Sequence, residues 1–223
     1  MKKFSIGFAA LLTLSTMGVA QADAGITASV GTTGAGLHVS VPVATALNAR
    51  VGINGLSISR DGNTSDVDYD YKLKMATVDA LLDYFPMAGG FRVSGGLAYN
   101  GNKIDVNGRP KSSGTYTLNG HVYPATAVGS LNGTVDFHKV APYLGIGWGN
   151  AVAADKGWGF STDIGVLFQG APNASLSNRG CTAIAAVCSQ IATDVAAESR
   201  SLQDDTSSFK AYPVLRLGVS YKF

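Results

Sequence analysis

The chain has 223 residues, only 14% of them charged, and its formal net charge of +2 is matched by Lys2 and Lys3 alone. This composition suits one folded domain and excludes a disordered tail protein. Because a phosphate-binding surface needs surplus lysine and arginine, the balanced charge of the remaining chain argues against a nucleic-acid partner.

The first 22 residues have the pattern of a secretory signal peptide. Two lysines precede a mostly apolar segment, and the sequence AQA at 20–22 matches the small-x-small cleavage site. The alternative, a retained membrane helix, is disfavoured because the apolar core is short and is interrupted by Ser15 and Thr16. We expect a signal peptide at 1–22 and one mature domain at 23–223, in which any membrane crossing is made by strands.

Alternating apolar and polar residues predict β-strands through most of the mature chain. Seven strands are expected, at 34–43, 47–59, 69–85, 90–105, 135–149, 157–172 and 209–223. Barrels made of one bacterial chain have an even number of strands, so an eighth is required. Residues 25–31 are the candidate, although they are fewer than the roughly 9 to 11 that span a membrane. Alternatively, they begin one long, bulged strand.

The last predicted strand has an apolar face and a charged face. Arg216 and Lys222 share the charged face. The apolar face consists of Leu215, Leu217, Val219, Tyr221 and Phe223. This pattern fits either the core face of a soluble sandwich or the lipid face of a membrane barrel.

The aromatic residues favour the membrane barrel. They gather beside two short connections, 85–90 and 149–157, and at the end of the last strand. A soluble sandwich has no reason to sort its aromatic residues in this way, whereas a barrel needs them at the membrane interface, here the periplasmic rim. The predicted belt consists of Tyr84, Phe85, Phe91, Trp148, Trp158, Tyr221 and Phe223.

Charged residues of both signs are expected on the inward faces of the strands. So many ions would be prohibitive in a dry core, whereas a barrel lumen can pair and hydrate them. The alternative places them on the solvated face of a soluble sheet. The predicted lumen network consists of Arg50, Lys72, Lys74, Asp79, Asp83, Arg92, Lys139, Asp163, Arg216 and Lys222.

The connections alternate between short turns and longer polar segments, as expected for periplasmic turns and extracellular loops. The long connections are 60–68, 105–137 and 173–208. Within the second, Asn119-Gly120 predicts a two-residue hairpin turn, so this loop is expected to project as a small β extension.

The last long connection contains the only two cysteines, Cys181 and Cys188. We expect them to form a disulfide, because thiols of exported chains are oxidised and a metal site would need further ligands. After them, the apolar residues Ile191, Val195 and Leu202 predict a short amphipathic helix that caps the outer mouth or rests on the last strand.

The histidines raise the alternative of an enzyme. His38 and Ser40 share one strand face, and Asp136 and His138 share another. A catalytic site needs a nucleophile, a base and an orienting group that converge, which this spacing does not establish. We therefore expect no catalytic residue, no bound cofactor and no metal. The alternate glycines at 145–149 are expected to make room for Tyr143 and the charged lumen side chains, or to allow curvature, rather than to form a nucleotide loop.

Two segments carry a family resemblance, APYLGIGWGN at 141–150 and YPVLRLGVSYKF at 212–223. The chain resembles small proteobacterial outer-membrane barrels with eight strands, such as the membrane domain of outer membrane protein A and outer membrane protein W. The resemblance implies an outer-membrane location in a Gram-negative bacterium, among outer-membrane lipids and lipopolysaccharide. It also implies that the barrel assembly machinery reads the terminal apolar set Leu215, Leu217, Val219, Tyr221 and Phe223.

The expected fold is all-β, a transmembrane antiparallel up-and-down barrel with long extracellular loops and one short loop helix. Eight strands enclose a space that their own side chains fill, so the lumen charges are expected to plug it. We expect a non-enzymatic outer-membrane protein with a structural or surface-interaction role carried by loops 105–137 and 173–208. The alternatives are a narrow channel for ions or small solutes, and a lipid-modifying enzyme.

Overall fold

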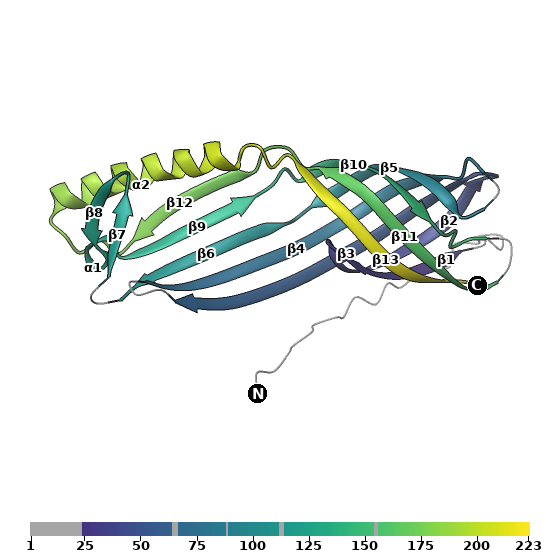
Figure 1. Ribbon diagram of the computed structural model, residues 1–223, viewed down its shortest axis with the longest axis horizontal. Helices are drawn as coiled ribbons and strands as arrows, with labels where there is room; N and C mark the ends of the chain where they lie inside the picture. Colours follow the sequence, from purple (N-terminus) through teal and green to yellow (C-terminus); the bar gives the residue numbers. More distant parts are fainter. Residues whose placement is uncertain (1–23, 64–66, 88, 112–113, 154–155) are drawn as a thin grey trace, which may run out of the picture.

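The computed structural model describes residues 24–63, 67–87, 89–111, 114–153 and 156–223, and the expected signal peptide at 1–22 lies outside them. The described chain is elongated and consists mainly of antiparallel strands. A ring of strands forms one half of its length and an open curved sheet forms the other half (Figure 1). No helix among the described residues is long and apolar enough to cross a membrane.

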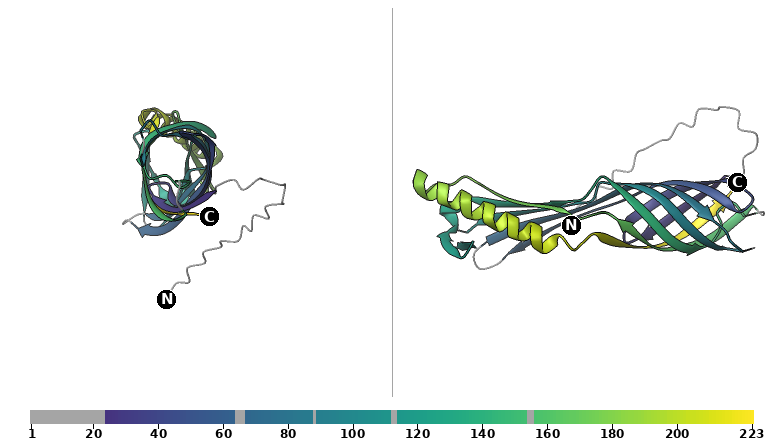
Figure 2. Two further views of the ribbon diagram at one scale, coloured as in Figure 1. Left: turned by 90° about the vertical axis from the view of Figure 1, so that its right-hand side faces the viewer. Right: turned by 90° about the horizontal axis from the view of Figure 1, so that it is seen from above.

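Eight antiparallel strands form the ring, which is closed when viewed along its axis (Figure 2). Each strand pairs with two neighbours, and the pairings of β4 with β5 and of β1 with β13 complete the circle. The ring strands are β1 (Gly25–Gly31), β2 (Gly34–Ala44), β3 (Leu47–Asn63), β4 (Val67–Tyr84), β5 (Phe91–Asn100), β10 (Val140–Trp148), β11 (Gly157–Phe168) and β13 (Ala211–Lys222).

The shortest ring strand, β1, confirms the predicted eighth strand at residues 25–31. All seven of its residues pair with β2 on one side and with β13 on the other. A strand held on both edges needs no further length of its own, because its neighbours satisfy its backbone donors and acceptors.

Side chains alternate across the ring wall, as the sequence predicted. In β13, Val214 and Arg216 are buried on the interior face, whereas Leu215 and Leu217 are exposed on the outer face. The ring is therefore polar and buried within, and apolar and exposed outside, which is the reverse of a water-soluble barrel.

The open half, here called the extension, is a continuation of five ring strands. β3 and β4 run on beyond the ring, and β6 (Lys103–Pro110), β9 (Ser130–Asp136) and β12 (Asn173–Arg179) continue the lines of β5, β10 and β11. The register of β4 with β5 resumes unchanged with β6, and that of β5 with β10 resumes between β6 and β9. Because β13, β1 and β2 end at the ring, the wall continues only as a half-pipe.

The prediction of long loops at 60–68, 105–137 and 173–208 is therefore wrong for most of their length. These segments carry strands and two helices, and three expected strands, 90–105, 135–149 and 157–172, each pass into the extension after a short interruption. The strand pattern continues there because β3 and β4 already offer a paired edge for β6 to follow.

A hairpin closes the far end of the extension. It consists of β7 (Thr115–Leu118) and β8 (His121–Pro124), followed by the short helix α1 (Ala125–Val128). Asn119 and Gly120 between the strands have φ values of 49° and 79°, the left-handed geometry of a type I′ turn. The hairpin predicted from Asn119-Gly120 is confirmed.

The helix α2 (Ala185–Thr206) has 22 residues and is longer than the short helix expected. It neither caps the ring nor rests on β13, but lies along β12 (Figure 1). The amides of Ala174 and Leu176 on β12 donate to Gln203 Oε1 and Ser199 Oγ, at 2.8 and 3.0 Å. Side chains of α2 thereby satisfy an edge that would otherwise be open.

Candidate functional site: the interior of the ring

The interior face of the ring carries a cluster of buried ion pairs. Arg50 on β3 is at its centre, where Nε lies 2.8 Å from Asp83 Oδ2 and Nη1 lies 3.0 Å from Asp163 Oδ2. Arg92 on β5 also contacts Asp163, with Nη2 at 2.9 Å from Oδ1. Ser94 donates to Asp83 at 2.5 Å. Four strands are therefore joined across the interior by charge-assisted hydrogen bonds.

A second cluster lies around Asp79 on β4. Its Oδ2 atom is 2.8 Å from Arg216 Nη2 and accepts from Asn54 Nδ2 at 2.8 Å. His38 Nε2 lies 3.4 Å from the same oxygen. Arg216 also donates from Nε to Thr33 Oγ1 at 3.1 Å. The carboxylate thus has several donors, as a buried charge requires.

Tyr143 on β10 fills the interior beside these clusters. Its ring lies 5.8 Å from the guanidinium carbon of Arg216, within range of a cation–π contact. A side chain at Gly145 or Gly165 would place its Cβ 2.5 Å from the Tyr143 hydroxyl oxygen. These glycines therefore make room for Tyr143, as expected for the alternate glycines at 145–149.

Not all of the predicted lumen charges belong to this interior. Arg50, Asp79, Asp83, Arg92, Asp163 and Arg216 form the two clusters. Lys222 is buried on the interior face at the end of β13, where Nζ donates to the carbonyl of Ala153. Lys72 and Lys74 are exposed on the part of β4 that pairs with β6, and Lys139 is exposed just before β10 begins.

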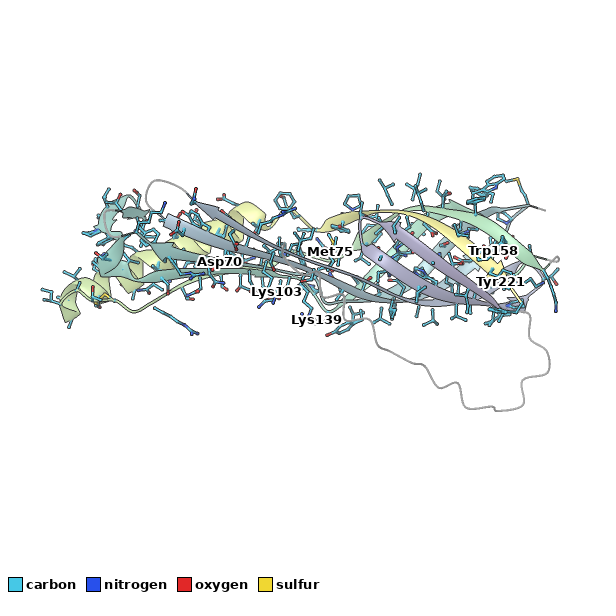
Figure 3. The ribbon with its side chains drawn as sticks, turned by 90° about the horizontal axis from the view of Figure 1, so that it is seen from below. Asp70, Met75, Lys103, Lys139, Trp158 and Tyr221 are labelled. Carbon is cyan, nitrogen blue, oxygen red and sulfur yellow. A yellow bond between two sulfur atoms is a disulfide. The ribbon has the colours of Figure 1, made fainter. Side chains whose placement is uncertain are left out.

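The placement of Lys72, Lys74 and Lys139 in the lumen was wrong for geometric reasons. Lys72 and Lys74 are an odd number of residues from Asp79, and β4 runs without a bulge between them, so they lie on the opposite face. Figure 3 shows Lys139 at the junction of the two halves, where it lies outside the ring strands.

The interior also contains polar residues outside the predicted lumen network, among them Thr33, Asn54 and Ser94. Strand alternation predicts an inward position for two of them. Asn54 follows Arg50 by four residues and Ser94 follows Arg92 by two, so each is in phase with an inward arginine on its strand. Thr33 lies in the turn between β1 and β2, where strand alternation gives no indication of direction.

The residues considered for an enzyme do not form one group. His38 contacts Asp79 in the ring interior, whereas Asp136 accepts from Asn173 Nδ2 at 3.3 Å on the exposed side of the extension. Within the described ranges, no group of three or more His, Cys, Asp or Glu side chains is placed to hold a metal ion. Cys181 and Cys188 form the expected disulfide ahead of α2.

The predicted aromatic belt lies at the end of the ring that carries both ends of the described chain. Trp158, Tyr221 and Phe223 form successive ring contacts, with centroids 5.1 Å apart in each pair (Figure 3 shows the first two). Trp148 and Phe91 form another contact at 6.5 Å, and Tyr84 is exposed on the same rim.

Phe85 does not belong to the exposed belt, since only 9% of it is accessible. It follows Tyr84 directly, so it points to the opposite side of the chain at the end of β4. The prediction that Phe85 belongs to the exposed belt is therefore wrong, because its side chain lies on the opposite side of the chain.

No family model matches the chain, and no curated protein sequence matches it. Two crystal structures are similar in fold. CarO2 of Acinetobacter baumannii has 24% identity and a TM-score of 0.57, and the match covers 91% of this chain and 99% of that chain. CarO of the same organism has 25% identity and a TM-score of 0.54, with coverage of 89% and 97%.

The similarity extends over both the ring and the extension, because nearly the whole of each chain is matched. Neither of these structures is outer membrane protein A or W, so the likeness to those proteins stays a prediction.

Proposed function

We propose that the chain is an integral outer-membrane protein, in which the ring is a transmembrane barrel with a closed lumen and the extension is a surface domain that binds its partner. The observation that carries this proposal is a reversal of polarity between the two faces of the continuous strands β3 and β4, where they leave the ring. The likeness to the two CarO structures supports the same overall architecture.

The reversal is clear along β3. On the outer face, Val51 and Ile53 are followed in phase by Ser57 and Ser59. A lipid-facing surface is apolar only within the hydrocarbon layer, so the change marks the level at which the wall leaves the membrane.

The same change occurs at the same level of β4. Its outer face passes from Val78 to Lys74, Lys72 and Asp70, which lie in water in this arrangement. Figure 3 shows Asp70 and Lys103 on the extension, away from the aromatic rim of the ring. The extension therefore projects from the membrane on the side opposite the rim with Trp158 and Tyr221.

The interior face changes in the opposite direction, from polar inside the ring to apolar in the extension. Arg50 and Asn54 of β3 are followed in phase by Leu56 and Ile58, which remain 41% and 37% exposed. Met75, Leu73 and Tyr71 continue this apolar face on β4. The inside of the half-pipe is thus apolar and partly open, and an open apolar face outside the membrane supports a binding role.

The ion pairs of the interior argue against steady conduction. The pair of Arg50 with Asp163 joins β3 to β11 on the opposite side of the ring, and Tyr143 is buried in the same interior. Opening a path would require several buried charges to lose their partners at once. We therefore favour surface interaction over transport. An enzymatic role ranks below both.

Cysteine labelling tests the proposed membrane boundary. In lipid vesicles, Ser57→Cys is expected to react with a water-soluble maleimide, and Ile53→Cys on the same face of β3 is expected to resist it. Both native cysteines are in the disulfide, so the added thiol alone reports. Equal reactivity at the two positions would contradict the assignment of the ring to the membrane.

Planar-bilayer recording tests the closed lumen. Purified protein that shows the heat-shifted gel mobility of a folded barrel is expected to give no steady single-channel current. A steady current that changes on substitution of Arg50 would replace the surface role with a transport role.

A further inference from the structure

A groove runs along the outer face of the ring over β1, β2, β11 and β13. Its central part has a volume of about 800 Å³ and is lined by Ala28, Ala35, Leu37, Phe160, Leu217 and Val219, among others. A second hollow of about 370 Å³ shares Ala28 and Val219 with it. The two hollows form one apolar track along the ring wall.

This track ends at the aromatic rim. The second hollow is lined by Trp158, Tyr221 and Phe223 together with Ile26. Phe160 and Trp158 project from β11 along one side and are 82% and 79% exposed. No charged residue lines either hollow in the described part of the chain.

The sequence provides the depth of the groove through small residues. The outer face of β1 and β2 carries the small residues Ala28 and Ala35 at the groove, whereas Leu82 and Leu144 are examples of larger side chains elsewhere on the outer face. Behind them, Gly218 points inward, and a Cβ there would lie 2.9 Å from the carbonyl oxygen of Ala28 and from Ser161 Oγ. Because the residues on both faces of the wall are small here, the neighbouring strands can lie close together.

We propose that this groove binds one acyl chain of a glycerophospholipid, with the headgroup at the aromatic rim. The proposal rests on the proposed function, because only a barrel in a membrane turns this face toward lipid. Its apolar lining suits a hydrocarbon chain, and its open end lies where Trp158 and Tyr221 mark the membrane interface. Since the extension leaves the membrane on the opposite side, the rim faces the periplasm and the lipid comes from the inner leaflet.

A lipid bound in the groove differs from the lipids that contact the rest of the ring wall. A flat apolar wall exchanges its neighbouring chains freely, whereas a chain in a groove is contacted on its sides by Phe160, Leu37 and Leu217 as well as from beneath. A longer residence of one lipid per chain is the expected consequence.

Native mass spectrometry of protein released from outer membranes in mild detergent tests the proposal. The wild-type chain is expected to retain one phospholipid. Ala28→Phe fills the groove from its floor and is expected to lower the retained fraction by about tenfold, which corresponds to displacing about two methylene groups from apolar contact. Ala80→Phe is the matched control, because Ala80 is also exposed on the outer face, on β4, away from the groove.

Quenching by phospholipid with brominated chains gives a second measurement. Trp148→Phe leaves Trp158 in the groove as the only tryptophan, and Trp158→Phe leaves Trp148 on the same rim outside it. Trp158 is expected to be quenched at a lower mole fraction of brominated lipid than Trp148. Adding Ala28→Phe is expected to abolish the difference.

Three outcomes overturn the proposal. They are equal quenching of the two tryptophans, retention of lipid that Ala28→Phe does not change, and a mass of two chains that Ala28→Phe converts to one, which would assign the groove to a second copy. Failure of the proposed function has a separate signature, because neither tryptophan would then be quenched and the heat-shifted band would be missing.

Discussion

Asp163 is a shared partner in the ring interior, because Arg50 and Arg92 both form ion pairs with its carboxylate. It accepts from Arg50 Nη1 at 3.0 Å and from Arg92 Nη2 at 2.9 Å, and all three side chains are almost fully buried. Burying charges is costly unless every one is paired, so removing this carboxylate leaves two cations with incomplete partners.

Asp163→Asn is therefore expected to lower the free energy of unfolding by about 3 to 5 kcal/mol. Urea titration in detergent micelles, followed by the heat-shifted gel mobility, measures the change. Asp105→Asn is the control, since Asp105 pairs with Lys103 at 2.8 Å on the partly exposed extension, where such a pair contributes about 1 kcal/mol or less. Equal effects of the two substitutions would mean that the interior ion pairs do not stabilise the ring.

Gly165 offers a test of how tightly the interior is packed. A Cβ at this position would lie 2.5 Å from the Tyr143 hydroxyl and 2.7 Å from the carbonyl oxygen of Leu144, which belongs to the paired strand and cannot move freely. Gly165→Ala is expected to cost about 1 to 3 kcal/mol in the same titration. Gly55→Ala, where the nearest atom is 3.6 Å away, is expected to change stability by less than about 0.5 kcal/mol. A tolerated Gly165→Ala would show that Tyr143 has room to move.

At the scale of elements, the buried carboxylate of Asp194 joins α2 to the β7–β8 hairpin, and Glu198 accepts one further hydrogen bond, from the Asn119 amide at 3.3 Å. Asp194 accepts from Tyr123 Oη at 2.5 Å, from His121 Nδ1 at 3.0 Å and from Asn119 Nδ2 at 3.2 Å. The hydrogen bond from Tyr123 is the main cause that holds the pKa of Asp194 below its ordinary value. Ile191 and Val195 on the same helix bury the apolar side of the contact.

This carboxylate predicts a loss of docking in acid. Because the folded pKa of Asp194 is depressed, its contribution is fully present above the unfolded value of about 3.9 and is lost as the pH falls through the folded pKa. Hydrogen-exchange protection of residues 115–124 is expected to fall in that range, and Asp194→Asn to show low protection already at neutral pH. Protection of β9 at 130–136 serves as the internal control. Protection of 115–124 that does not change with pH would contradict the prediction.

The ring strands could be predicted from the sequence, because an alternation such as that of Leu215 and Leu217 with Arg216 fixes both the strand and its faces. The interior cluster could be predicted in part, since Arg50, Asp83, Asp163 and Arg216 are each in phase with buried neighbours. The extension could not be predicted. There the alternation continues through Leu56 and Ile58, but the apolar residues change faces where β3 and β4 leave the ring, and a pattern of period two does not show on which side water lies.

At the scale of the whole molecule, the end of the chain completes both the ring and the aromatic rim. Phe223 contacts Tyr221, and its amide donates to the carbonyl of Ala24 at 3.3 Å. If the terminal apolar set is read during assembly, deleting Phe223 is expected to reduce the heat-shifted form in outer-membrane fractions. Phe209→Ala, at an exposed site before β13, is expected to leave that amount unchanged. Equal amounts of the folded form in the two variants would remove the assembly role of the terminal residue.

The closure of the ring by β1 and β13 also sets the order in which the molecule can fold. Hairpins such as β3–β4 form from residues close in sequence, but the seam between β1 and β13 joins opposite ends of the described chain. Until β13 is present, β1 and β11 both expose unpaired edges, which favour aggregation. A chain that is truncated before residue 211 therefore cannot close the ring. Such truncated products are expected to be degraded by proteases during export.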